Sequence, residues 1–103
     1  MMIQGGRSKK QTGISFPRME CWSPIIGMAT FAADHNGSRI LCRIESGALS
    51  ARDDRPSAMA ALADQRAAVH AVARVLIEEQ RFEEDGSILI RDHDMSAAPV
   101  EQL

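Results

Sequence analysis

The chain has 103 residues, which is enough for one small domain. Its formal net charge is -2, which excludes a long-range attraction of the whole molecule to nucleic-acid phosphates. Only three Phe and one Trp supply large apolar surface, so we expect a thin core that self-association helps to stabilise. Two cysteines do not form a disulfide framework, and no apolar run is long enough to cross a bilayer. These features predict a cytoplasmic protein that does not enter membranes.

The charges are distributed unevenly along the chain. Residues 1–18 contain four basic and no acidic residues, whereas residues 78–103 contain eight acidic and two basic residues. Such asymmetry can guide partner choice or let the two ends attract each other. Residues 1–13 contain few large apolar side chains, which predicts a disordered basic arm, followed by a single domain at 14–94 and a disordered acidic tail at 95–103.

The first half of the domain shows the pattern of strands. Ile14 and Phe16 alternate before Pro17, which predicts a short edge strand, and the segment 21–24 follows as a turn or a strand end. Asn36-Gly37 separates two apolar runs, at 26–33 and 39–45, and is a strong signal for a β-hairpin because both residues tolerate positive φ. In the second run, alternate residues are apolar and are expected to face the core: Ile40, Cys42 and Ile44.

The second half is dominated by an Ala-rich stretch that predicts one long helix from Ser57 to Arg81. Residues 47–49 form a turn or a helical stub before it, and either Asp54 or Ser57 can cap the helix. The apolar face is expected to pack on the sheet and consists of Leu62, Val69, Val72, Ala73 and Leu76. Phe82 is predicted to close the core beyond the helix. A last strand then follows the Asp85-Gly86 turn, with Ile88 and Ile90 inward.

Together these elements predict an α+β fold. A small antiparallel sheet, made of the β-hairpin and short flanking strands, packs on one long C-terminal helix, and the last strand comes after that helix.

Two groups of basic residues are candidate contacts for a partner or a phosphate. Arg66, His70 and Arg74 recur at helical spacing and form a basic stripe on one flank of the predicted helix. A mobile basic arm also gains affinity for nucleic acids through counterion release, and its charged residues are Arg7, Lys9 and Lys10.

No residue pattern indicates catalysis, a cofactor or a metal. Cys21 and Cys42 lie in no CxxC pair, and no sequence signature supplies a base for them, which favours unreactive thiols. His93 with its neighbours Asp92 and Asp94 matches no metal motif and is typical of a solvated loop. We therefore predict no catalytic, cofactor-binding or metal-binding residues.

The order of structural residues resembles the DUF1488 family of short bacterial proteins, whose function is unknown. The resemblance covers roughly residues 14–94 and rests on Phe16-Pro17, Trp22, Phe31, Ala33, Gly37, Ile40, Cys42, Ile44, Ala48-Leu49, Leu62, Arg66, Val72, Leu76-Ile77, Phe82, Asp85-Gly86 and Ile88. It implies a small α+β domain with an antiparallel sheet and one long helix, and it implies no catalytic residues. The basic arm and the residues after Asp94 are additional to the family's pattern.

Three hypotheses on function follow. The favoured one is a non-enzymatic interaction or structural domain that binds an unknown protein partner or a second copy of itself. The alternative is a nucleic-acid-associated regulator that uses the basic arm and the Arg/His stripe. A small enzyme or redox protein centred on Cys42 is the third.

Overall fold

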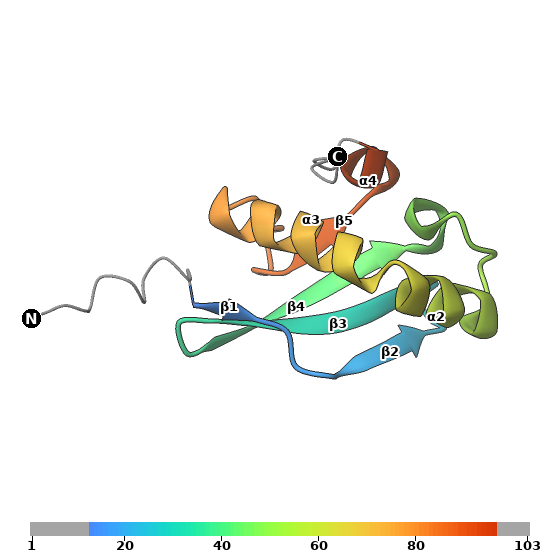
Figure 1. Ribbon diagram of the computed structural model, residues 1–103, viewed down its shortest axis with the longest axis horizontal. Helices are drawn as coiled ribbons and strands as arrows, with labels where there is room; N and C mark the ends of the chain where they lie inside the picture. The colour runs from blue at the N-terminus through green and yellow to red at the C-terminus, as the bar shows by residue number, and fades with distance from the viewer. Residues whose placement is uncertain (1–12, 97–103) are drawn as a thin grey trace, which may run out of the picture.

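The computed structural model describes residues 13–96; most of the predicted arm, residues 1–12, and residues 97–103 of the predicted tail lie outside them. Strands and helices lie in two layers, with α2 and α3 on one face of the sheet (Figure 1). The predicted α+β class is confirmed. In chain order the elements are β1 Ile14–Ser15, β2 Glu20–Ser23, β3 Met28–His35, β4 Ser38–Glu45, the 3-10 helix η1 Ser46–Leu49, α2 Arg55–Asp64, α3 Arg66–Glu78, β5 Ile88–Ile90 and α4 Asp92–Ser96.

The β3–β4 hairpin is present where the sequence predicts it. The turn residues Asn36 and Gly37 both have positive φ, 53° and 88°, as the tight turns that match the twist of two strands require. The strands pair antiparallel from His35 with Ser38 to Met28 with Glu45. This register turns the predicted residues of β4 toward the helices, where Ile40, Cys42 and Ile44 are buried.

One edge of the hairpin is completed by two short strands. Both β1 and β2 pair antiparallel with β3 and follow each other along it. The break between them contains Pro17, which has no N–H to donate to a strand ladder. The predicted edge strand is confirmed, and the segment from Cys21 to Ser23 is a strand rather than a turn.

The other edge differs from the prediction of a wholly antiparallel sheet. β5 pairs parallel with β4, with Cys42 opposite Ile88 and Ile44 opposite Ile90, so the sheet is mixed. The chain crosses the sheet through α2 and α3 before it forms β5 (Figure 1), and this crossover returns the strand in the same direction as β4.

The predicted helix is present but divided into α2 and α3 at Gln65, which has φ -107° and ψ 15°. The Gln65 side chain donates a hydrogen bond to the Leu49 carbonyl, 2.8 Å away, and so ties the junction to η1. At the start of α2, Asp54 is the cap: its carboxylate accepts from the Ser57 N–H at 2.8 Å. Neither Gly nor Pro occurs at the junction, so the sequence pattern predicts one continuous helix across it.

The end of α3 explains why Phe82 does not close the core. Gln80 adopts a left-handed conformation with φ 59°, and the Arg81 and Gln80 N–H groups bond back to the carbonyls of Leu76 and Ile77 at 2.8 and 3.0 Å. This is a Schellman ending, which turns the chain sharply out of the helix. Phe82 therefore remains 40% exposed, and the prediction that it is a core residue is wrong.

The core lies between the sheet and the helices and is built mainly of aliphatic side chains. All five predicted helix residues, Leu62, Val69, Val72, Ala73 and Leu76, are buried, as are Ile88 and Ile90. Trp22 packs against the cluster from its rim. The last helix, α4, was not predicted; it crosses the predicted domain boundary at residue 94, and Met95 packs against the core.

The opposite face of the sheet has no covering layer in the described part of the chain (Figure 1). The register places on this outer face the residues that alternate with the buried ones, namely Ser15 of β1, Cys21 and Ser23 of β2, Met28, Thr30, Ala32 and Asp34 of β3, Arg39, Leu41, Arg43 and Glu45 of β4, and Leu89 of β5. No helix within residues 13–96 has the length and apolar character to cross a membrane.

The contrast between buried and exposed aliphatic residues yields a stability prediction. Ile44 is fully buried, whereas Ile25, in the turn between β2 and β3, is 92% exposed. We expect Ile44→Ala to lower the free energy of unfolding by about 2–5 kcal/mol and Ile25→Ala to change it by about 0.5 kcal/mol or less. Urea denaturation of both variants measures this difference, and equal effects would contradict the described core.

Candidate functional site

The predicted basic stripe lies on the flank of α3 that faces the β1–β2 edge. Arg66, His70 and Arg74 belong to successive turns of α3, and each contacts a residue from this edge. Arg7, Lys9 and Lys10 lie outside the described residues. The stripe is thus brought together with residues near the start of the chain, which sequence spacing did not indicate.

Arg66 is already paired within the chain. Its Nε and Nη2 donate to the two carboxylate oxygens of Glu20 at 2.7 and 2.8 Å, a forked geometry with the specificity of a bidentate ion pair. The Arg66 hydrogen bond, opposed by burial, holds the pKa of Glu20 below its ordinary value, and the Glu20 hydrogen bond raises the pKa of Arg66. This pair fastens β2 to α3 and uses two of the five N–H donors of Arg66.

His70 is packed between aromatic rings instead of pointing into solvent. Its ring is stacked on Phe16, with centroids 4.0 Å apart and planes 10° apart, and it lies 5.5 Å from the Phe31 ring. Burial lowers the pKa of His70, opposed by Glu20 and reinforced by Arg66 and Arg74. The imidazole is therefore neutral at pH 7 and acts as a flat packing surface.

Arg74 makes the last contact of this cluster. Its guanidinium carbon lies 5.3 Å from the centroid of the Phe16 ring, a cation–π arrangement. Phe16 thus contacts both His70 and Arg74, which are one helical turn apart. No local sequence pattern indicates these contacts of Phe16 and Glu20. Glu20 and Arg66, for example, are 46 residues apart in the chain.

The other candidate groups are the two cysteines and the segment around His93. Cys42 is buried, and burial raises the pKa of its thiol to about 12, so it is protonated at neutral pH and a poor nucleophile. Cys21 is an exposed free thiol. His93 Nε2 lies 3.4 Å from Asp94 Oδ1, but no group of three or more potential metal ligands exists among residues 13–96.

The outer face of the sheet is a surface feature that the packing of the core does not explain. Leu41, near its centre, is 48% exposed, and Met19, whose sulfur lies 3.0 Å from Arg39 Nη1, is 51% exposed. Ala32 is opposite Leu41 in the register and is buried even though no helix of residues 13–96 covers it. The centre of the face is therefore apolar.

The two basic residues of this face are paired within the chain. Asp34 accepts two hydrogen bonds from Arg39, at 2.5 and 3.2 Å. Arg43 Nη2 donates to Ser87 Oγ at 2.6 Å and lies 3.5 Å from Asp85. With Asp34 and Glu45 against Arg39 and Arg43, the face has no net charge.

The Glu20–Arg66 pair leads to a pH-dependent prediction. Because folding lowers the pKa of Glu20 from 4.5, its contribution to stability is complete above pH 4.5 and is lost as the pH falls through the folded-state value. Glu20→Gln should therefore reduce the urea midpoint at pH 7, and its deficit should shrink below pH 4.5.

Urea denaturation over this pH range tests the pair, with Arg66→Ala and the double variant completing a cycle. A constant deficit down to the lowest pH, or strictly additive effects of the two substitutions, would contradict the proposed coupling.

Comparison with known proteins agrees with the geometry. The family model described as "Protein of unknown function (DUF1488)" matches residues 14–90. A crystal structure of a DUF1488 protein of unknown function from Shewanella loihica PV-4 shares the fold, with a TM-score of 0.72 and 23% identity over 77% of this chain and 92% of that chain. No curated protein matches. The family model covers well over half of the sequence, and the chain therefore belongs to the DUF1488 family.

Proposed function

We propose that the protein is a non-enzymatic interaction domain whose partner is a second copy of the same chain, bound through the outer face of the sheet. The observation that supports this proposal most directly is the apolar centre of an uncovered face, with Leu41 and Met19 about half exposed. Exposed apolar patches surrounded by polar residues mark interaction surfaces.

Charge supports a second copy as the partner. An isologous interface brings the same surface of two subunits together, so a face with excess charge of one sign would repel its copy. The outer face has no net charge, and the Arg39–Asp34 pair is closed within the subunit. Packing two such faces would therefore bury Leu41 and Met19 without bringing together an excess of charge of one sign.

The thin core also favours association. Much of it consists of alanine, including Ala29, Ala33, Ala58 and Ala73, all fully buried, and alanine contributes little apolar area per residue. A dimer would add buried area that the subunit lacks. The unreactive state of Cys42 supports a non-enzymatic role, and the free thiols of Cys21 and Cys42 favour a cytoplasmic location.

Dimerisation is tested with Leu41→Glu, which would place a carboxylate at the centre of the interface. We expect the unaltered chain to reach the mass of a dimer in sedimentation equilibrium as concentration rises, and Leu41→Glu to remain monomeric while still folded. Ile25→Glu, in an exposed turn outside the face, is the matched control and should still dimerise. A chain that stays monomeric at every concentration, or a Leu41→Glu variant that dimerises normally, would refute the proposal.

The second candidate function is a nucleic-acid-associated regulator. The supporting observation is the position of Arg18 and Arg74: Arg18 is exposed, and Arg74 lies over Phe16, in the loop that follows β1. The basic residues Arg7, Lys9 and Lys10 precede β1 directly in the sequence. Arg66 is already paired with Glu20.

This candidate predicts salt-sensitive binding to a DNA duplex, measured by fluorescence anisotropy. Deletion of residues 1–12 and the substitution Arg74→Gln should each weaken binding, whereas Arg55→Gln, an exposed arginine at the start of α2, should not. Absence of binding at low salt, or equal effects of all three changes, would rule out the specific surface.

A further inference from the structure

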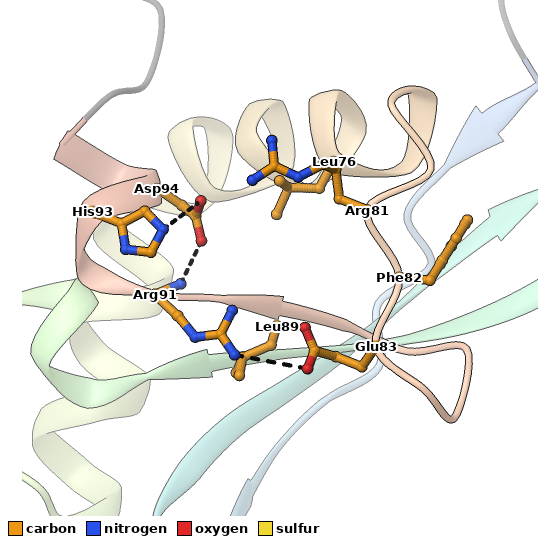
Figure 2. Close-up of a pocket in the computed structure, with 8 residues that line it drawn as sticks. All are labelled: Leu76, Arg81, Phe82, Glu83, Leu89, Arg91, His93 and Asp94. Carbon is orange, nitrogen blue, oxygen red and sulfur yellow. Dashed lines mark hydrogen bonds and ion pairs between the residues drawn. The ribbon is translucent and has the colours of Figure 1, made fainter.

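A cavity of about 160 Å³ lies along the outer edge of β5, on the side of the sheet opposite to β1 and β2 (Figure 2). Cofactors and drug-sized molecules occupy about 300–1,000 Å³, so the cavity is too small for one of them. The lining residues are Leu76 of α3, Arg81, Phe82 and Glu83 of the following segment, Leu89 and Arg91 at β5, and His93 and Asp94 of α4.

The charged side chains of the lining select neither an anion nor a cation. The two arginines, Arg81 and Arg91, are balanced by the two carboxylates of Glu83 and Asp94. His93 Nε2 lies 3.4 Å from Asp94 Oδ1. A ligand of either charge would therefore meet both attraction and repulsion.

The apolar residues of the lining do not form an apolar pocket either. Leu76 is buried in the core on the inner face of the sheet, and Phe82 points away from the cavity (Figure 2). The side chain of Leu89 belongs to the outer face of the sheet by register. What Leu89 can offer to the cavity is its backbone.

The register of the hairpin determines which backbone groups face this edge. A two-residue turn makes the residues on either side of it, His35 and Ser38, a hydrogen-bonded pair. Such pairs alternate along an antiparallel ladder, so Phe31 and Cys42 form another. The next residue, Arg43, therefore directs its N–H and C=O away from β3 and toward β5.

This arrangement turns the backbone of Leu89 outward. Leu89 lies opposite Arg43 in the parallel pair of β4 and β5. In a parallel ladder, a residue bonds to the two neighbours of the residue opposite it, which for Arg43 are Ile88 and Ile90. The N–H and C=O of Leu89 consequently point away from β4, into the cavity.

The positions on either side of Leu89 along this edge already have partners. The Ser87 carbonyl accepts from the Glu83 N–H at 2.8 Å, and the Arg91 N–H donates to the Asp94 carboxylate at 2.9 Å. The two backbone groups of Leu89 have no partner in the described part of the chain. The edge can thus accept one hydrogen-bonded residue pair of an added strand.

A single residue pair favours a segment of the same chain over a separate peptide. Two backbone hydrogen bonds contribute little net free energy, whereas a separate molecule also loses translational and rotational freedom when it binds. A tethered segment has already lost most of that freedom. Residues 97–103 follow α4 directly in the sequence, and Asp94 of α4 lines the cavity.

The length and the sequence of residues 97–103 suit this position. An extended chain advances about 3.3 Å per residue, so the four residues from Ser96 to Val100 reach about 13 Å. The short connection through α4 favours an antiparallel return along β5. Val100 is the only β-branched residue of the seven. If it pairs with Leu89, Pro99 faces away from β5, where an edge strand tolerates its missing N–H.

We infer that residues 97–103 add a short antiparallel strand to the outer edge of β5, with Val100 opposite Leu89. The Val100 N–H donates to the Leu89 carbonyl, and the Leu89 N–H donates to the Val100 carbonyl. Because opposite residues share a face of the sheet, the two side chains lie next to each other on the outer face. The added strand closes this edge against pairing with other chains, whether or not the outer face forms a dimer.

Amide hydrogen exchange of the full chain, followed by nuclear magnetic resonance, tests this inference. The Leu89 amide should exchange slowly in the unaltered chain. Val100→Pro removes one of the two hydrogen bonds and places a ring between the strands, so it should speed Leu89 exchange about tenfold. Glu101→Pro is the matched control, because the N–H of residue 101 faces away from β5, and it should leave Leu89 protected.

Two results would overturn the inference. One is a Leu89 amide that exchanges in the unaltered chain as fast as an unpaired amide. The other is an equal exchange rate of Leu89 in the two proline variants, because its protection would then not depend on the pairing with Val100. Well-dispersed spectra show that each variant is folded.

Discussion

The register of β3 is the constraint on which the rest of the structure depends. β1, β2 and β4 all pair with this strand, and each takes its inner and outer faces from it. A slip of one residue would exchange the faces of every strand attached to it. The Asn36-Gly37 turn fixes the register because its two positive φ angles permit a tight connection between β3 and β4. The core and the apolar outer face are thus two results of the same alignment.

The residues that look most like a binding site serve mainly to join the layers. Arg66 binds Glu20, and His70 and Arg74 contact Phe16, so the flank of α3 is held to the β1–β2 edge by one ion pair and a group of stacked rings. These contacts suit a domain with a small core, because they fasten an edge whose strands are too short to hold by pairing alone. A basic stripe on a helix is therefore weak evidence for a ligand until its partners are known.

Two features of the surface remain available for function. Within residues 13–96 the outer face is uncovered, because α2 and α3 pack on the other side of the sheet (Figure 1). The cavity beside β5 exists because α3 ends in a sharp turn and α4 folds back next to the strand (Figure 2). The two features meet at Leu89, which belongs to the outer face by register and also lines the cavity.

The sequence by itself determined the elements that depend on residues close together in the chain. Asn36-Gly37 predicted the hairpin, alternation placed Ile40, Cys42 and Ile44 in the core, the helical period identified Leu62 to Leu76 as the packing face, and the same pattern identified the family. Only the tertiary structure decided the division of the helix at Gln65, the parallel direction of β5, the exposure of Phe82, and the partners of Arg66 and His70. These depend on contacts between residues far apart in the chain, such as Glu20 with Arg66, or on backbone turns at residues like Gln80 that are not the usual turn formers. Local patterns specify which residues are buried, whereas the pairing of distant side chains depends on how the buried faces meet.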